Sequence, residues 1–264
     1  MSIPLAAQEQ PIDHEVVATN VFVDSSPDIS SCAICAANEL NLCPATYRNG
    51  EPDTNRRPSA PLAATFHAIP ARRTILHSTE WSEFVSIICH GWAMSSAALP
   101  DGRRQILSFL LPGDMLSAGS LFEPISGRPV EAVTDVTYRN YKRSDLKSIL
   151  FEFPDAFDAL TKPYLEEKKQ ADQLAVDLGS RTADERIARL ILYLKDRLTK
   201  RGMAQDHTME FPLRQHHIAD ATGLTPVHVS KVLSKFRRDG LIEISNRSLT
   251  VLDPAEFGRV ANML

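Results

Sequence analysis

Four cysteines are the residues whose chemistry stands out. Three of them, Cys32, Cys35 and Cys43, form the pattern C-x2-C-x7-C, and Cys89 is the fourth. Four thiolates at one site are a ligand set for an iron–sulfur cluster or for structural zinc. The three clustered cysteines lie in an irregular segment that offers no hydrophobic core, which favours a role as ligands over a role in packing. Zinc and a thiol redox switch are alternatives, as is a chain without a cofactor in which Cys89 is only a small core residue.

Basic and polar side chains also gather on one predicted helix, from Pro226 to Arg238, which contains no acidic residue. Such a helix can lie in the major groove of DNA, with its N-terminal residues against base edges and other residues on phosphate. Val227 could contact a thymine methyl group, and Lys231 could donate to guanine acceptors. An ordinary solvated basic helix is the alternative. The predicted base-reading residues are Val227, His228, Ser230 and Lys231, and the predicted phosphate contacts are Lys235, Arg237, Arg238 and Arg247.

The elements around this helix have the pattern of a winged helix-turn-helix. Residues 214–222 favour a first helix, Gly223 favours the turn, and Thr225 is placed as the N-cap of the second helix, with a proline in its first position. Residues 211–213 resemble a short preceding strand, and residues 241–252 alternate around a turn as in a two-stranded wing. The predicted inward-facing residues of the two helices are Ile218, Ala219, Val229, Val232, Leu233 and Phe236.

A long helix is predicted before this unit. Apolar residues recur in steps of three and four from residue 157 to residue 178, a heptad seam typical of a helix that pairs with its copy in a second subunit. Pro163 is expected to kink or end the first part, and packing on the chain's own domain is the alternative. Thr182-Ala-Asp-Glu185 is a capping-box pattern that opens the next helix. The predicted dimerisation residues are Phe157, Leu160, Tyr164, Ala171, Leu174 and Leu178.

Short apolar runs alternate with turn signals from about Arg73 to Asp145. Residues 106–111, for example, are followed by Pro112-Gly-Asp114. Strands at a spacing of about 8–12 residues predict an antiparallel barrel or roll. Such a roll can enclose a ligand or only its own core, and its sequence does not decide between the two.

The length and composition fit two domains, with 264 residues of which 43% are hydrophobic and 23% are charged. No apolar run approaches the roughly 18 residues of a membrane helix, and the N-terminus lacks a signal-peptide pattern, so a cytoplasmic protein without membrane contact is expected. The net charge of −4 is unevenly divided, because residues 181–247 hold 13 Lys and Arg against 8 Asp and Glu, and the remainder carries −9. A basic C-terminal part fits one domain that meets phosphate.

These patterns predict an α+β fold in four parts. The parts are an N-terminal tail with the cysteine-bearing segment over residues 1–61, a β-roll sensor domain over 62–153, a dimerisation helix over 154–179, and a winged helix-turn-helix DNA-binding domain over 180–264. The adjacent His216 and His217 are expected to cover a helix surface. Because no catalytic spacing is present, the chain is not predicted to be an enzyme.

Several stretches resemble the Crp/Fnr family of bacterial transcription regulators. They are Gly102-Arg-Arg-Gln-Ile106, Leu111-Pro-Gly-Asp114, Thr182-Ala-Asp-Glu-Arg186 and Ile218-Ala-Asp-Ala-Thr-Gly-Leu-Thr-Pro-Val-His-Val-Ser-Lys-Val-Leu233. They follow the family's order of a cyclic-nucleotide-binding-like roll, a dimer helix and a winged helix. The resemblance implies a homodimer on a palindromic operator in double-stranded DNA, with recruitment of RNA polymerase. Many members carry a Glu and an Arg where this chain has Val227 and Lys231, so a different target sequence is expected.

The cysteine spacing is similar to that of the oxygen-sensing Fnr branch, which uses an oxygen-labile 4Fe–4S cluster to switch dimerisation. The resemblance implies that an intact cluster lets the long helices pair and that oxygen weakens the dimer. The fourth cysteine of the best-known members aligns with Arg139, so Cys89 must reach the cluster from an earlier strand. Adjacent strand residues point to opposite faces, so at most one of Cys89 and His90 is expected to face a given pocket.

Cyclic-nucleotide members of the family hold the phosphate with an Arg-Ser pair. Here Arg128 is followed by proline, so a cyclic nucleotide is not expected as the ligand. Competing hypotheses are a family regulator controlled by zinc, a thiol switch or another small ligand, and a metal-binding module whose winged helix contacts protein. Salt dependence distinguishes the last of these, because phosphate contacts release counterions.

Overall fold

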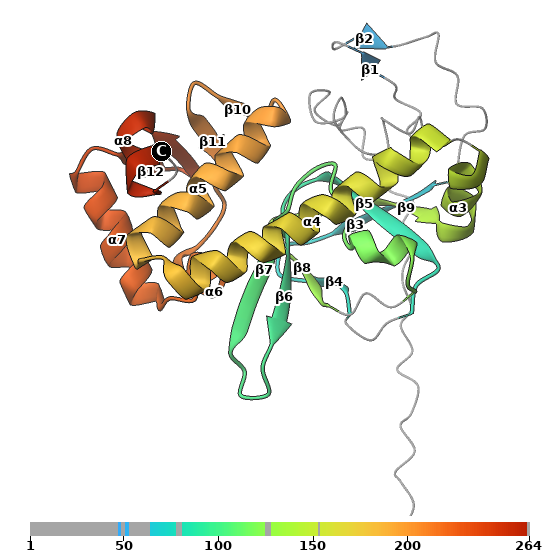
Figure 1. The fold of residues 1–264 in the computed structure, drawn as a ribbon, viewed down its shortest axis with the longest axis horizontal. Helices are drawn as coiled ribbons and strands as arrows, with labels where there is room; N and C mark the ends of the chain where they lie inside the picture. The colour runs from blue at the N-terminus through green and yellow to red at the C-terminus, as the bar shows by residue number, and fades with distance from the viewer. Residues whose placement is uncertain are drawn as a thin grey trace, which may run out of the picture.

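The computed structural model describes residues 47–48, 51–52, 64–77, 81–124, 128–152 and 154–262. The long helix α4 (Pro154–Ser180) links two bodies (Figure 1). The strands of a roll gather along one side of this helix, and a mostly helical unit with its own small sheet follows its C-terminal end.

The first body is an antiparallel roll of two sheets, ordered β3-β9-β5 and β4-β8-β6-β7. Its strands are β3 (Ala64–Ile69), β4 (Thr74–Leu76), β5 (Phe84–His90), β6 (Ala93–Ala98), β7 (Arg104–Leu110), β8 (Val130–Ala132) and β9 (Val136–Lys142), with the 3-10 helix η1 (Ala118–Leu121) between β7 and β8. A separate short pair is formed by β1 (Tyr47–Arg48) and β2 (Glu51–Pro52). Ile88, Val130, Val136 and Tyr138 belong to the buried cluster of the roll. The predicted roll is therefore confirmed.

Two helices follow the roll. The first, α3 (Arg143–Glu152), was not predicted, because the alternating apolar pattern of the strands extends to about Asp145. The second, α4, passes through Pro163 as one helix of 27 residues, so of the two expected outcomes, a kink or an end, Pro163 does not end the helix. The residues after Pro163 are mostly Glu, Lys, Gln, Ala and Leu, whose helix propensity outweighs the loss of one backbone hydrogen bond.

The second body is the DNA-binding unit that the sequence predicts, with additional elements. Its helices are α5 (Ala183–Lys200), α6 (Gln215–Thr222), α7 (Pro226–Arg238) and α8 (Pro254–Val260), and its strands are β10 (Ala204–Gln205), β11 (Thr208–Glu210), β12 (Ile242–Ser245) and β13 (Ser248–Val251). The capping box at the start of α5 is confirmed, because Thr182 Oγ1 accepts from the Glu185 N–H and the Glu185 carboxylate accepts from the Thr182 N–H.

Two details of the wing differ from the prediction. The strand before α6 is Thr208–Glu210, whereas residues 211–213 are irregular. The Phe211 N–H still donates to Arg247 O at 2.7 Å, in line with the pairing of β11 and β13, and Pro212 then lacks the N–H that a longer strand would use. Because β11 pairs with β13, the two predicted wing strands belong to a four-stranded sheet, ordered β10-β11-β13-β12.

One hydrophobic core joins the two bodies. Trp92, Phe109 and Leu111 of the roll belong to the same buried cluster as Leu194 and Leu198 of α5. The roll and the DNA-binding unit are therefore packed against each other within the chain rather than only tethered. Within the described part of the chain, no helix is long and apolar enough to cross a lipid bilayer.

Candidate nucleic-acid interface

The N-terminus of α7 is held by a cap. Thr225 Oγ1 accepts a hydrogen bond from the His228 N–H at 3.2 Å, and Pro226 occupies the first helical position. The cap satisfies one of the free N–H groups that a helix leaves at its start. It fixes the first turn of α7, where Val227 and His228 lie.

The two faces of α7 differ as the sequence predicts. Its inward face packs Val229, Val232, Leu233 and Phe236 into the core, each 4% exposed or less. Its outward face presents Val227, which is 67% exposed, together with exposed His228 and Lys231, while Ser230 is half-buried. An aliphatic side chain this open at the start of a recognition helix is placed to meet an apolar group on a partner.

The basic residues beyond this turn are in different situations. Arg237 and Arg238 are exposed, and Arg238 Nε lies 3.6 Å from Oδ1 of the neighbouring Asp239. Lys235 Nζ instead lies 2.5 Å from Asp184 Oδ2 of α5, which raises the pKa of Lys235 through this hydrogen bond and the carboxylate charge. Sequence reasoning missed Asp184 as this partner, because 51 residues separate the two in the chain.

Arg247 lies at the tip of the wing. It is exposed, and both it and Asn246 have left-handed backbones, with φ of 63° and 48°. Two consecutive positive φ angles are the mark of the type I′ hairpin turn that suits the twist of two strands. The turn therefore projects Arg247 away from the sheet β12–β13.

A tight turn sets the angle between α6 and α7. Gly223 has φ of 66°, and its N–H donates to Ala219 O, so α6 ends in a left-handed C-cap. The expectation that His216 and His217 both cover a surface was wrong for His217, which is 8% exposed. His217 Nδ1 accepts from the Arg214 N–H at 3.2 Å, so the side chain caps the start of α6. Burial lowers the pKa of His217 to about 4.

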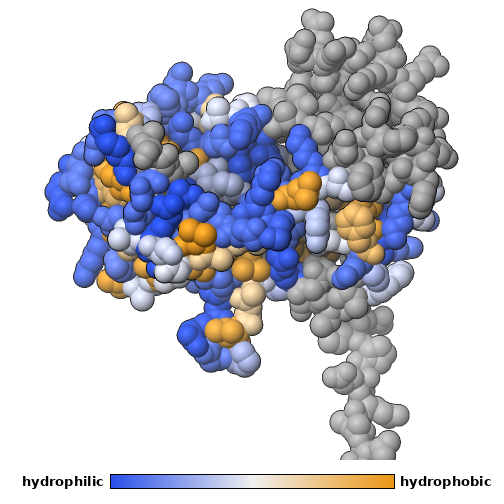
Figure 2. Space-filling model, in the orientation of Figure 1, coloured by the Kyte–Doolittle hydropathy of each residue, from blue (hydrophilic) through white to orange (hydrophobic). Residues whose placement is uncertain are grey.

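The predicted dimer seam lies along α4. Ala171 is exposed, and Leu174 and Leu178 are half-buried. Tyr164 is 50% exposed and meets Phe122 of the same subunit edge-on, with ring centroids 6.1 Å apart. Figure 2 shows isolated hydrophobic patches on the face that α4 crosses, between stretches of hydrophilic surface. The side chains of Phe157 and Leu160 lie outside the described part of the structure.

A groove of about 410 Å³ runs between α4 and β7, with Leu107 and Leu174 among its lining residues. Arg128 is at its edge, where its Nη2 lies 3.0 Å from Glu167 Oε1 of α4. Cyclic-nucleotide members of the family use an arginine at the position of Arg128 to hold the ligand phosphate. In this chain Arg128 is instead paired with the carboxylate of Glu167.

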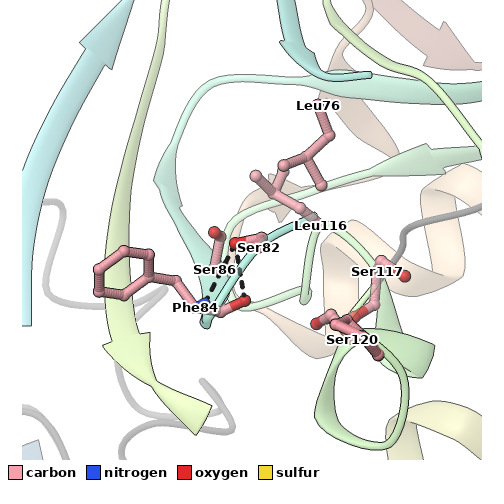
Figure 3. A pocket seen from close by; sticks show the side chains of 8 residues that line it. Leu76, Ser82, Phe84, Ser86, Leu116, Ser117 and Ser120 are labelled. Carbon is pink, nitrogen blue, oxygen red and sulfur yellow. Dashed lines mark hydrogen bonds between the residues drawn. The ribbon is translucent and has the colours of Figure 1, made fainter. Parts of the chain in front are cut away.

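A second hollow in the roll is too small to hold a ligand (Figure 3). Its space of about 10 Å³ has room for roughly one water molecule. Two of the hydroxyls that line it have partners within the protein: Ser82 Oγ accepts from the Phe84 N–H at 3.1 Å, and Ser86 Oγ donates to Asn140 Oδ1 at 2.6 Å.

Of the four cysteines, the structure describes Cys89, whereas Cys32, Cys35 and Cys43 lie outside the described residues. Cys89 is half-buried in β5, and the register with β9 shifts between Ile88 and His90. Because this irregularity falls at Cys89, the simple alternation expected for Cys89 and His90 does not apply. Among the described residues, no group of three or more His, Cys, Asp or Glu is arranged to hold a metal ion.

Arg139, the position aligned with the fourth cysteine of the Fnr branch, lies on β9, the strand that pairs with the strand of Cys89. Arg139 of β9 pairs with Ile87 of β5, two residues before Cys89. The guanidinium of Arg139 lies 4.2 Å from the centre of the Phe66 ring.

A β-roll joined through a long helix to a winged helix with an exposed basic recognition helix defines a DNA-binding transcription regulator rather than an enzyme. Residues 66–153 match the family model of the cyclic nucleotide-binding domain, and residues 185–260 match that of the Crp-like helix-turn-helix domain. The nitrogen fixation regulation protein FixK of Bradyrhizobium diazoefficiens is 35% identical over 62% of this chain and 68% of that protein. The chain belongs to the Crp/Fnr family.

Other relatives agree with this assignment. The transcriptional activator protein FnrL of Cereibacter sphaeroides is 28% identical over 74% of this chain and 78% of that protein. The solved structure of FixK2 from Bradyrhizobium japonicum superposes with a TM-score of 0.69, at 29% identity, over 75% of this chain and 98% of that one.

Proposed function

We propose that the protein is a homodimeric transcription activator that binds a palindromic operator and responds to oxygen or a related redox signal through a 4Fe–4S cluster. The exposed, capped start of α7 is the observation that carries the DNA-binding part. The activator role is supported by the names of FnrL and of the activatory protein AadR of Rhodopseudomonas palustris. Recruitment of RNA polymerase is the expected means of activation.

In this proposal the first turns of α7 read bases. Val227 contacts a thymine methyl group, Lys231 donates to guanine, and His228 and Ser230 complete the set. Arg237, Arg238 and Arg247 contact phosphate, and Lys235 does so by exchanging Asp184 for a phosphate oxygen. Thr225 holds the turn that carries the base readers.

The DNA-binding proposal is tested on Lys231→Ala, with Lys200→Ala as the matched control. Lys200 is an exposed lysine of α5 whose charge is paired with Asp196 at 2.6 Å. An operator is first selected from random duplexes with the wild type. Lys231→Ala should lower the affinity for this operator by about 1–3 kcal/mol with little effect on unrelated duplex DNA. Equal losses on both would make Lys231 a phosphate contact, and failure of the wild type to select any sequence would overturn the proposal.

Dimerisation through α4 is supported by the apolar residues that the helix leaves open. Leu165 and Val176 are 57% and 50% exposed, and Ala171 is exposed beside the groove. A second copy of α4 would cover such residues and would place two recognition helices about 34 Å apart, one turn of DNA. Leu174 lines the groove against β7 and lies on nearly the opposite side of α4 from Val176, so one partner helix would not cover both.

The cluster proposal rests on the spacing of Cys32, Cys35 and Cys43 and on the position of Cys89. Cys89 is half-buried, and its strand also borders Arg139, the position of the fourth ligand in the Fnr branch. A thiolate at either position would approach the same part of the sheet β3-β9-β5. Such a cluster would supply the sensitivity to oxygen, because oxygen dismantles it. The chain would supply the four thiolates that hold the cluster. Strand β5, which carries Cys89, would pass the loss of the cluster on to the roll.

Anaerobic purification tests the cluster. A broad visible absorption band with about four iron and four sulfide per subunit is expected from the 4Fe–4S assignment. Cys89→Ser should remove the absorption band and the bound iron and sulfide. The matched substitution Ser86→Ala on the same strand should retain them. Zinc without sulfide would replace the cluster by a structural metal site, and a colourless, metal-free protein would leave a thiol switch or no cofactor.

The groove between α4 and β7 favours a second candidate, a family regulator that senses a small ligand there. Its space of about 410 Å³ is of the size that small molecules occupy. Because Glu167 already pairs with Arg128, a cyclic nucleotide is not the ligand that we propose. Calorimetric titration with cyclic AMP and cyclic GMP checks this point, and micromolar binding would favour the second candidate.

A metal-binding protein-interaction module is the remaining alternative. It predicts little salt dependence of duplex binding, whereas phosphate contacts give a steep one.

A further inference from the structure

A buried carboxylate joins the roll to the DNA-binding unit. Asp114, in the turn after β7, accepts hydrogen bonds from Arg197 of α5 and from Arg201 at the C-cap of that helix, the latter at 2.6 Å. The same arginines also donate to backbone oxygens of the roll, Arg197 Nη1 to Phe109 O at 2.7 Å and Arg201 Nε to Pro112 O at 3.0 Å. Two guanidinium groups of one unit are thus held by one short segment of the other.

These charges are largely removed from water. The side chains of Asp114, Arg197 and Arg201 are 17%, 11% and 16% exposed. Burial by itself would lower the pKa of Arg197, and the charge of Asp114 raises it above its usual value. Removal of the carboxylate would leave two buried cations without their counter-charge, which is unfavourable unless the two units move apart and admit water.

The turn that carries Asp114 is also bonded to β5. The Ile88 N–H donates to Asp114 O at 2.9 Å, and the Gly113 N–H donates to Ile88 O at 2.8 Å. The Asp114 carboxylate accepts from the Leu111 N–H at 2.7 Å, which fixes the shape of the turn. The turn therefore connects β5, at the residue before Cys89, with α5.

A second set of polar contacts joins the roll to the DNA-binding unit, through α6 rather than α5. Arg104 of β7 contacts Asp220 of α6 at 2.9 Å and Glu131 of β8 at 3.1 Å, and Gln105 Nε2 donates to Ala221 O at 3.1 Å. The orientation of α5 and α6 relative to the roll is thus fixed at two separate places.

We infer that Asp114 is a positioning residue for DNA binding, which holds α5 and hence the α6–α7 pair at one orientation to the roll of the same subunit. The inference rests on the proposed function only in that the chain binds an operator as a dimer. Two recognition helices can enter successive major grooves only if each keeps its orientation to the dimer axis. Attraction to unrelated DNA depends on charge and is insensitive to that orientation.

The central test is Asp114→Asn, with Asp101→Asn as the matched control. Asp101 is an exposed aspartate in the β6–β7 turn that contacts Arg103 of the same turn. Asp114→Asn should lower the affinity for the selected operator at least tenfold and change the affinity for unrelated duplex less than twofold. It should also broaden the distance distribution between spin labels on the exposed positions Leu99 of the roll and Glu243 of the wing. Asp101→Asn should change none of these quantities.

A second variant covers the case in which Asp114→Asn does not fold. Arg201→Gln keeps the contact between Asp114 and Arg197, so the same changes are expected at smaller size. An unchanged distance distribution with unchanged operator affinity in either folded variant would overturn the inference, and so would parallel losses on operator and unrelated DNA. A wild type that selects no operator would instead count against the proposed function. The spin-label distances would still show whether Asp114 fixes the orientation of the DNA-binding unit to the roll.

Discussion

Leu178 at the end of α4 lies directly against Gly223 in the turn between α6 and α7. Its Cδ2 atom is 3.0 Å from the place that a Cβ on Gly223 would take, and φ at Gly223 is 66°. The helix with the predicted dimer seam and the turn of the helix-turn-helix are therefore in contact within one subunit. A residue assigned from the sequence to pairing between subunits also supports the DNA-reading turn.

Replacement of Gly223 by alanine should destabilise the protein. The new methyl group would press on Leu178, and a left-handed backbone costs a non-glycine residue roughly 1–2 kcal/mol. Urea denaturation followed by circular dichroism should show a lower free energy of unfolding. Gly179→Ala is the control, because no atom lies within 4 Å of a Cβ there and alanine is favoured in a helix. A stability of Gly223→Ala equal to that of Gly179→Ala would contradict the prediction.

Loss of the α7 cap should weaken both the fold and operator binding. Thr225→Ala removes the oxygen that accepts from the His228 N–H and should cost about 1 kcal/mol of stability. Because the first turn carries Val227 and His228, operator affinity should fall more than affinity for unrelated DNA. Thr225→Ser keeps the oxygen and should restore both, as thermal unfolding and fluorescence anisotropy can measure. If serine fails to rescue, Thr225 acts through its methyl group or a direct DNA contact instead.

The basic residues at the end of α7 should contribute unequally to the salt dependence of binding. An exposed arginine on phosphate adds about 0.9 to the slope of log affinity against log salt. Arg237→Ala should reduce the slope by about that amount per subunit. Lys235→Ala should reduce it by less, because Lys235 gives up its contact with Asp184 when it binds phosphate. Titrations between low and moderate salt measure both, and a larger loss for Lys235→Ala would show that phosphate readily displaces Asp184.

Stability of the DNA-binding unit should fall in mild acid through His217. Burial lowers the pKa of His217 to about 4, from an ordinary value of 6.5. As the pH falls through 6.5, the unfolded chain takes up a proton that the folded protein excludes, so stability drops until about pH 4 and then levels for this group. His217→Gln should flatten the profile from urea denaturation, and His228→Gln, at an exposed position of α7, should keep it. Identical profiles for His217→Gln and wild type would assign the pH dependence elsewhere.

The DNA-binding helices could be predicted in detail because local rules determine them. Thr225, Pro226 and Gly223 specify a cap, a helix start and a left-handed turn through their own backbone chemistry, and the structure confirms all three. The inward-facing residues of α7 follow from a period of 3.6 residues, which needs no knowledge of the partner surface.

Contacts between distant segments could not be predicted in this way. Asp114 is 83 residues from Arg197, and Asp184 is 51 residues from Lys235, so no periodicity or spacing relates them. The burial of His217 and the strand Thr208–Glu210 also depend on packing and pairing partners elsewhere in the fold. The cluster and the dimer remain predictions, since three of the cysteines and two of the seam side chains lie outside the described residues.

The core shared by the roll and the DNA-binding unit bears on how the regulator can be divided. A fragment that begins at α5 would lose the part of the shared core that Trp92, Phe109 and Leu111 supply, and would leave Arg197 and Arg201 without the Asp114 carboxylate. Such a fragment should self-associate or unfold more readily than the whole chain. The winged helix of this regulator is thus not a portable module, and exchanging it between relatives should require transplanting the matching surface of β7 and the Asp114 turn with it.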